Sequence, residues 1–159
     1  MPKIFAERMI PHIDGDFVIF LFGLRINRPW KVHKWWPVLS AMPRMIKELE
    51  SKPELGLLGY IFGFKVMIQY WRSFDHLEAY ARSKENAHLP AWKAFNASVG
   101  KSRGDVGIWH ETYQVRAGEY EAIYSGMPEI GLGAASELIS VSKDTDKARD
   151  RIRHLRSQQ

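Results

Sequence analysis

The segment 16–26 limits the fold more than any other, because it is apolar almost without a break. Aromatic and aliphatic residues follow one another from Phe17 to Leu24, between Gly15 and a turn that Pro29 favours. A strand with one wet face would alternate apolar and polar residues. The segment therefore predicts a strand in the middle of a sheet, with apolar side chains on both faces.

The rest of the chain alternates between helical and extended patterns. We expect a helix at 29–49 that Pro37 and Pro43 kink or break, followed by strands at 57–62 and 65–72 around a turn at Gly63 and Phe64. A helix from Phe74 that Ser73 caps, a kink at 83–86 and a helix at 90–99 come next. The last elements are a polar loop at 101–105, a hairpin of strands 107–115 and 120–124, and a loop at 126–133. A short strand at 5–10 precedes them. This order predicts an α+β, ferredoxin-like βαββαβ fold.

One face of the expected sheet is covered by two helices, and its other face also carries aromatic and aliphatic residues. That second face would meet water unless something covers it, and a second copy of the chain is the simplest cover. We therefore expect a homodimer, a dimeric α/β-barrel with a small-molecule pocket between sheet and helices.

Length and charge limit the domain organisation and the partners. A chain of 159 residues is about one domain long, so we expect residues 1–142 to form one domain and residues 143–159 a basic helix or tail, solvated or frayed. The formal net charge is +5, and much of the excess lies in that tail. We therefore expect no nucleic-acid partner.

The absence of cysteine excludes disulfides, thiolate nucleophiles and cysteine-bound metal clusters, and it allows the cytoplasmic location that we expect. The longest apolar run, 17–24, is too short to cross a bilayer. Residues 1–8 lack the apolar stretch of a secretion signal. We therefore expect no membrane partner.

Six histidines are the side chains that acid–base or metal chemistry would use first. Two stand out: His88, at a helix break one turn before Trp92, and His110, in the middle of a strand. Neither has the spacing of a metalloprotease pair, and the chain has no carboxylate cluster or nucleophile elbow, so spacing alone leaves a structural role open for both. The six tryptophans, three of them at 30–36, favour packing or a pocket lid.

Three stretches resemble a known family: residues 70–81, which begin Tyr-Trp-Arg-Ser-Phe, residues 88–96, His-Leu-Pro-Ala-Trp-Lys-Ala-Phe-Asn, and residues 107–113, Gly-Ile-Trp-His-Glu-Thr-Tyr. The family consists of monooxygenase-like dimeric α/β-barrel proteins, is named after a fungal biosynthetic monooxygenase, and is similar to haem-containing phenylacetaldoxime dehydratases. The resemblance covers about residues 17–141. A dehydratase carries two such domains in one polypeptide and is much longer than this chain.

Similarity to the dehydratases implies a haem-binding lyase. His88 resembles the axial ligand of haem b and His110 the distal acid–base residue, with Arg72 and Glu111 as orienting groups. The aromatic walls of the pocket would come from Trp71, Trp92, Phe95 and Tyr124.

Similarity to the monooxygenase-like barrels implies an oxidoreductase that needs no cofactor. Such a protein supplies a base and a dry cavity to an electron-rich aromatic or other small apolar substrate. Trp71, Asn96 and His110 are the candidates for this chemistry.

Two other functions share the predicted fold. An RNA-recognition module has the same order of elements, but residues 63–71 carry its Gly- and Phe-rich motif in the wrong order. A non-catalytic small-ligand carrier or structural dimer is a stronger alternative, because no motif in the chain requires an enzyme.

Overall fold

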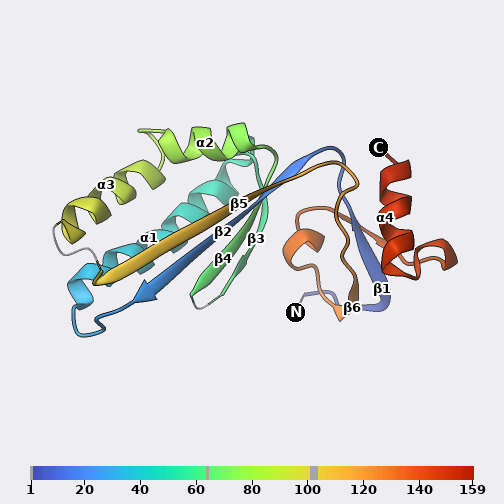
Figure 1. The fold of residues 1–159 in the computed structure, drawn as a ribbon, viewed down its shortest axis with the longest axis horizontal. Coiled ribbons are helices and arrows are strands. Elements are labelled where there is room, and N and C mark those ends of the chain that lie inside the picture. Colours follow the sequence, from blue (N-terminus) through green and yellow to red (C-terminus); the bar gives the residue numbers. More distant parts are fainter. Residues whose placement is uncertain (1, 64, 101–103) are drawn as a thin grey trace.

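Four antiparallel strands form the main sheet of the computed structural model, which describes residues 2–63, 65–100 and 104–159 (Figure 1). The strands are β2 (Phe17–Ile26), β3 (Leu57–Phe62), β4 (Val66–Trp71) and β5 (Val106–Val115), and their order is β3-β4-β2-β5. This order is ferredoxin-like, with the apolar strand β2 in the interior, so both predictions are confirmed. Phe64 and residues 101–103, on which parts of the expected turn and loop fall, lie outside the described ranges.

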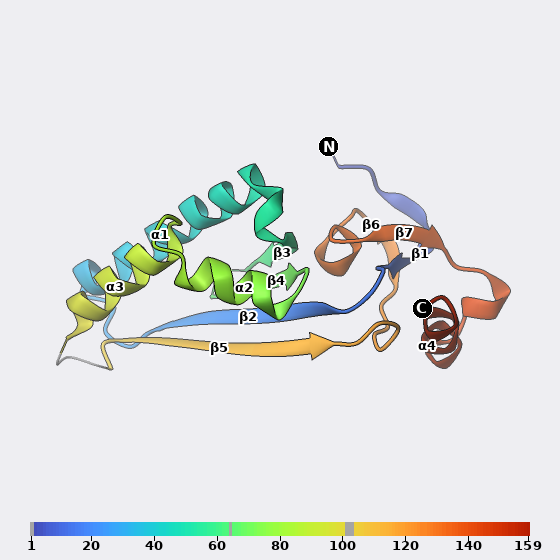
Figure 2. The same cartoon turned by 90° about the horizontal axis from the view of Figure 1, so that it is seen from above.

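Three helices lie on one face of this sheet (Figures 1 and 2): α1 (Val32–Ser51), α2 (Phe74–Arg82) and α3 (His88–Val99), with a short 3-10 turn at Pro53–Leu55. The prolines at 37 and 43 do not end α1. Each removes one backbone hydrogen bond, but the buried stripe of α1, which includes Ile46 and Leu49, keeps the helix on the sheet. As predicted, Ser73 caps α2, and its hydroxyl accepts the N–H of His76 at 3.2 Å.

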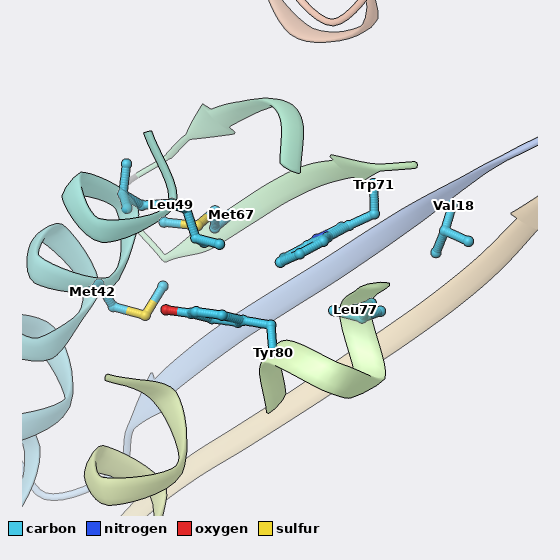
Figure 3. Close-up of a cluster of buried hydrophobic side chains, with 8 residues drawn as sticks. Val18, Met42, Leu49, Met67, Trp71, Leu77 and Tyr80 are labelled. Atoms are coloured by element: carbon cyan, nitrogen blue, oxygen red, sulfur yellow. The ribbon is translucent and has the colours of Figure 1, made fainter. Parts of the chain in front are cut away.

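The core between helices and sheet is built around Trp71, which is 1% exposed (Figure 3). Its ring packs against that of Tyr80 from α2, with centroids 5.7 Å apart, and its indole N–H donates to Gln69 at 3.0 Å. Val18, Met42, Ile46, Leu49, Met67 and Leu77 complete this cluster. One buried aromatic therefore joins β2, β4, α1 and α2.

A second, smaller sheet is formed by segments from both ends of the chain, in the order β6-β1-β7. Its strands are β1 (Phe5–His12), β6 (Tyr124–Met127) and β7 (Glu137–Ser140), and α4 (Ala148–Ser157) lies beside them (Figure 1). The strand expected at 5–10 is confirmed. The predicted hairpin of 107–115 with 120–124 is wrong, because β6 pairs with β1 and β5 with β2.

Backbone contacts near α4 explain why the chain leaves β5 at this point. The turn after β5 contains Gly118, whose positive φ of 71° suits glycine, and a side chain there would collide with the backbone of Arg156 in α4. After the turn, Glu119 and Glu121 pair with Arg156 and Arg151 of α4, so the chain continues toward α4 and not back along β5. Residue spacing near the turn could not show this, because the competing contact comes from the end of the chain.

The basic segment 143–159 is a packed part of this second unit. It forms a 3-10 turn (Lys143–Thr145) and α4, with Arg151 and Leu155 6% and 1% exposed. The Arg151 guanidinium pairs with Glu121 at 2.5 Å and donates to the backbone carbonyl of Asp146 at 2.6 Å. The other arginines of α4 remain exposed.

The segment between β6 and β7 returns to the main sheet and covers one end of its second face. A 3-10 turn at Gly131–Gly133 places Leu132 in a cluster with Phe17 and Tyr70. The positive φ of 60° at Gly131 suits glycine, and a side chain there would displace the end of the Ile61 side chain. The chain therefore buries part of the face that we expected a second copy to cover.

Candidate functional site

His88 is the first residue of α3, and its imidazole is held on one side. Its Nδ1 lies 3.0 Å from the carbonyl oxygen of Ala81, the next-to-last residue of α2. Because a carbonyl can only accept, Nδ1 carries the proton and Nε2 of the neutral ring keeps its lone pair. The ring also packs on Tyr80, with centroids 6.0 Å apart. An imidazole oriented in this way is suited to bind a metal centre through Nε2.

Glu48 of α1 fixes the backbone immediately before His88. Its carboxylate accepts the N–H of Ala87 at 2.8 Å, the hydroxyl of Tyr80 at 3.1 Å and the ammonium of Lys52 at 3.3 Å. Burial opposes ionisation, but these three donors hold the pKa of the Glu48 carboxyl below its ordinary value. Burial, and then the Glu48 carboxylate, raises the pKa of Tyr80. We call Glu48, Tyr80, Ala87 and His88 the α1–α3 clamp.

The sequence did not single out Glu48 or Tyr80. Tyr80 lies within the motif at 70–81, but Glu48 is 39 residues from Ala87 and 32 from Tyr80. No local pattern could reveal these contacts, because they depend on how α1 crosses the α2–α3 junction.

His110 is in the middle of β5, opposite Phe22 of β2, and points to the helix-covered side of the sheet. Its ring lies over that of Phe20, with centroids 5.5 Å apart. The side chain is nevertheless exposed, and α3 lies mainly against α1 (Figure 2). Within the described part of the chain, no hydrogen bond engages either of its ring nitrogens. Phe20, His110 and Thr112 form an open patch, which we call the His110 surface.

α3 carries the next group of predicted site residues. Trp92 is 44% exposed, one turn after His88, and stacks on Phe95 with centroids 5.7 Å apart. Phe95 packs, with Ile108, against the cluster that contains Val106 at the start of β5. The Asn96 side chain donates to the carbonyl of Trp92 at 3.0 Å. Phe95 therefore belongs to the same packing cluster as Ile108, which lies two residues before His110 in β5.

The remaining predicted residues lie elsewhere. Trp71 is in the core, and Arg72 donates to the carbonyl of Asp14 at 3.4 Å at the end of β4. Glu111 is on the opposite face of β5 from His110 and accepts the Tyr113 hydroxyl at 2.6 Å. Tyr124 is in the smaller sheet, where its hydroxyl accepts the N–H of Gly133 at 2.9 Å. The structure groups His88, Trp92 and Phe95 on α3, and it separates Arg72, Glu111 and Tyr124 from them.

The second face of the main sheet has an uncovered part beyond the Gly131–Gly133 turn. Trp109 and Tyr113 of β5 are 41% and 51% exposed there, and Val66 of β4 is 38% exposed. A side chain on Gly23 of β2 would collide with the Trp109 ring, so this glycine allows the indole to lie on the strand. Leu21 and Ile68 belong to the same face. We call Leu21, Val66, Ile68, Trp109 and Tyr113 the open sheet face.

Among the described residues, no three His, Asp or Glu side chains are grouped so that they could hold a metal ion. A haem iron, by contrast, can be held by a single histidine of the protein. His88 meets the requirement for such a ligand through its anchored Nδ1, whereas Glu111 is on the wrong face of β5 to orient His110.

Comparison with known proteins supports the fold and identifies a family. The model of monooxygenase af470-like proteins matches residues 17–132. A curated relative, monooxygenase af470 from Aspergillus fumigatus, is 26% identical over 144 residues, which cover 82% of this chain and 50% of the relative. The chain thus spans half the length of that relative.

Two solved structures of aldoxime dehydratases share the fold. One, crystallised with butyraldoxime, has a TM-score of 0.59 at 15% identity, and the matched region covers 96% of this chain and 44% of the dehydratase chain. The other has a TM-score of 0.54 at 16% identity, and the matched region covers 92% of this chain and 43% of that dehydratase chain. The similarity therefore includes most of the smaller sheet and α4 as well as the ferredoxin-like part.

Proposed function

The chain belongs to the monooxygenase af470-like family, and on that premise we propose that it is a monooxygenase-like enzyme for a small apolar or aromatic molecule. The substrate binds over the His110 surface, between sheet and helices. The observation that carries the proposal is the state of His110. Its imidazole is exposed and lies beside Phe20, and no described protein group forms a hydrogen bond with its ring nitrogens.

The residues suit base-assisted oxidation by O₂ without a cofactor. A neutral His110 accepts a proton from an electron-rich substrate such as a phenol with an activated CH₂ group. The CH₂ carbon then gives up both hydrogens and gains one oxygen atom as a carbonyl, and the second oxygen atom leaves as water. The substrate supplies all four electrons, so no external reductant is needed. Phe20, Trp92 and Phe95 provide the apolar surface on which such a ring can stack.

Oxygen consumption tests this proposal. The purified protein is mixed with a panel of phenolic and polyketide-like aromatic compounds, and wild type is compared with His110→Ala and His110→Gln. We expect both variants to lose at least about 10²-fold of the rate, the typical contribution of a positioned base. His154→Gln, a change in α4, is the matched control. Equal rates in wild type and His110→Ala would exclude His110 as the base.

A haem-dependent lyase resembling the aldoxime dehydratases is the second candidate, and the bond from His88 Nδ1 to Ala81 favours it. His88 would hold the iron through Nε2, and the clamp through Glu48 would fix the imidazole. A bound haem would supply a Lewis-acidic iron to the substrate, and His110 would move the proton.

Visible absorption distinguishes this candidate from the first. A Soret band in protein supplied with haem, which His88→Ala removes and His154→Gln keeps, establishes ligation through His88. A colourless protein that consumes oxygen supports the cofactor-free enzyme. A protein that shows neither property is a ligand-binding or structural dimer.

We also propose that two copies associate through the open sheet face. Trp109 and Tyr113 are exposed aromatics on a strand that the chain itself leaves uncovered, and aromatic residues dominate the energetics of protein interfaces. Sedimentation velocity on wild type and Trp109→Glu tests this. We expect the variant to weaken self-association by at least about tenfold, whereas Phe74→Glu, at the start of α2, leaves it unchanged. A wild-type monomer at all concentrations would refute the dimer.

A further inference from the structure

The beginning of α1 exposes more large apolar surface than a short segment normally does. Trp30 is 74% exposed, Val32 49% and Trp36 57%. Val32, Trp36 and Leu39 are spaced i, i+4, i+7 and therefore share one side of the helix. Leu39 lines a shallow apolar depression whose other side is formed by Phe62, itself 55% exposed, from the end of β3. An apolar stripe thus runs along α1 from Val32 to Leu39 and on to Phe62, and the exposed Trp30 directly precedes the helix.

Cationic residues accompany this stripe. Arg28 and Lys31 precede the helix and pair with Asp105 at 3.2 and 2.8 Å, and Lys65 lines the same depression as Phe62. Asp105 has only 5% of its side chain exposed, so its charge faces these two cations and not the solvent. The helix dipole disfavours cations at this end, yet the first turn has no acidic residue and no side-chain cap. The cations at the start of α1 therefore do not serve to stabilise the helix itself.

We propose that the α1 stripe docks on the surface of an anionic phospholipid membrane. Exposed tryptophan beside lysine and arginine matches the interface of such a bilayer, where indole rings lie at the headgroup level and cations meet lipid phosphates. The described helices include none that is long and apolar enough to cross a bilayer. A contact made by exposed aromatic and cationic side chains in this way is peripheral and reversible. It brings the protein to the place where an apolar substrate concentrates.

Vesicle sedimentation of the full chain tests the proposal. We expect binding to vesicles of phosphatidylcholine with phosphatidylserine, weaker binding to phosphatidylcholine alone, and loss of binding at high salt. Trp30→Ala with Trp36→Ala should lower the partition coefficient by at least about tenfold. Phe74→Ala removes a 40% exposed aromatic from the start of α2 and should bind as wild type does. Brominated lipids should quench the fluorescence of wild type and not that of the double variant.

Equal vesicle binding by wild type and the double variant would overturn the proposal. So would a wild type that binds no vesicle but loses self-association in the double variant, because the stripe would then be a protein contact. The two tryptophans are exposed, so the variant should keep the circular dichroism spectrum and unfolding midpoint of wild type. The vesicle assay needs no substrate, so its outcome does not depend on the proposed oxidation.

Discussion

The two faces of the main sheet differ in how far the chain buries their aromatic side chains. On the helix side, Trp71 is 1% exposed and Tyr80 4% exposed, each held by a specific hydrogen bond. On the other side, Trp109 and Tyr113 are about half exposed, although they too are aromatic residues on or beside this sheet. The difference shows that residue type alone does not define a core. What decides is whether the chain itself supplies a covering layer.

The largest expected effect comes from removing one tryptophan on each face and comparing the losses of stability. Trp71→Ala should lower the free energy of unfolding by about 3–5 kcal/mol, because it leaves a cavity shared by four elements. Trp109→Ala should cost about 1 kcal/mol or less in the monomer, since water already reaches the ring. Urea unfolding at one fixed protein concentration measures both. Equal losses would mean that the open sheet face is packed in solution.

An intermediate effect is expected for Glu48→Gln in the α1–α3 clamp. The change weakens the acceptor of three donors and should cost about 1–3 kcal/mol at neutral pH. The folded-state pKa of Glu48 is lowered, so its stabilisation is full above about pH 4.5 and is lost as the pH falls through the folded value. The stability curves of variant and wild type should therefore converge in acid.

Unfolding measured against pH checks this prediction. Glu50→Gln is the control on the same helix, because the hydrogen bond that Glu50 accepts from Tyr60, at 2.8 Å, is exposed. A constant difference between Glu48→Gln and wild type at every pH would contradict the electrostatic account.

The smallest and most closely matched test removes one hydroxyl from each face. Tyr80 donates to Glu48 at 3.1 Å in the core, and Tyr113 donates to Glu111 at 2.6 Å on the surface. Tyr80→Phe should cost about 1 kcal/mol, whereas Tyr113→Phe should leave the stability nearly unchanged, although the surface bond is shorter. Thermal unfolding of the two variants decides between burial and distance as the determinant.

The sequence predicted the ferredoxin-like layer because its signals are local. The uninterrupted apolar segment places β2 inside the sheet, and Ser73 marks the start of α2. The smaller sheet was missed because β6 and β7 are four residues long and pair with β1, more than 100 positions away. Patterns within a few residues contain no information about such a partner.

Within the candidate site, the sequence singled out the two histidines but not the residues that hold His88 in place. His88 and His110 are recognisable by type, and the structure puts both on the helix-facing side of the molecule. Glu48 is one of many surface-like glutamates until α1 is placed against the α2–α3 junction. Tyr124 and Arg72 looked like neighbours of the site only because their distance in space could not be known.

The pairing of β1 with β7 has a consequence for synthesis. Ile10 pairs with Ile139, so β1 has no complete sheet until β7 has also been synthesised. The layer of β2 to β5, whose helices connect nearby strands, has the lower contact order and should form first. During that interval β1 is an unpaired edge, and its arginine and glutamate at positions 8 and 7 are suited to keep it from joining other nascent chains.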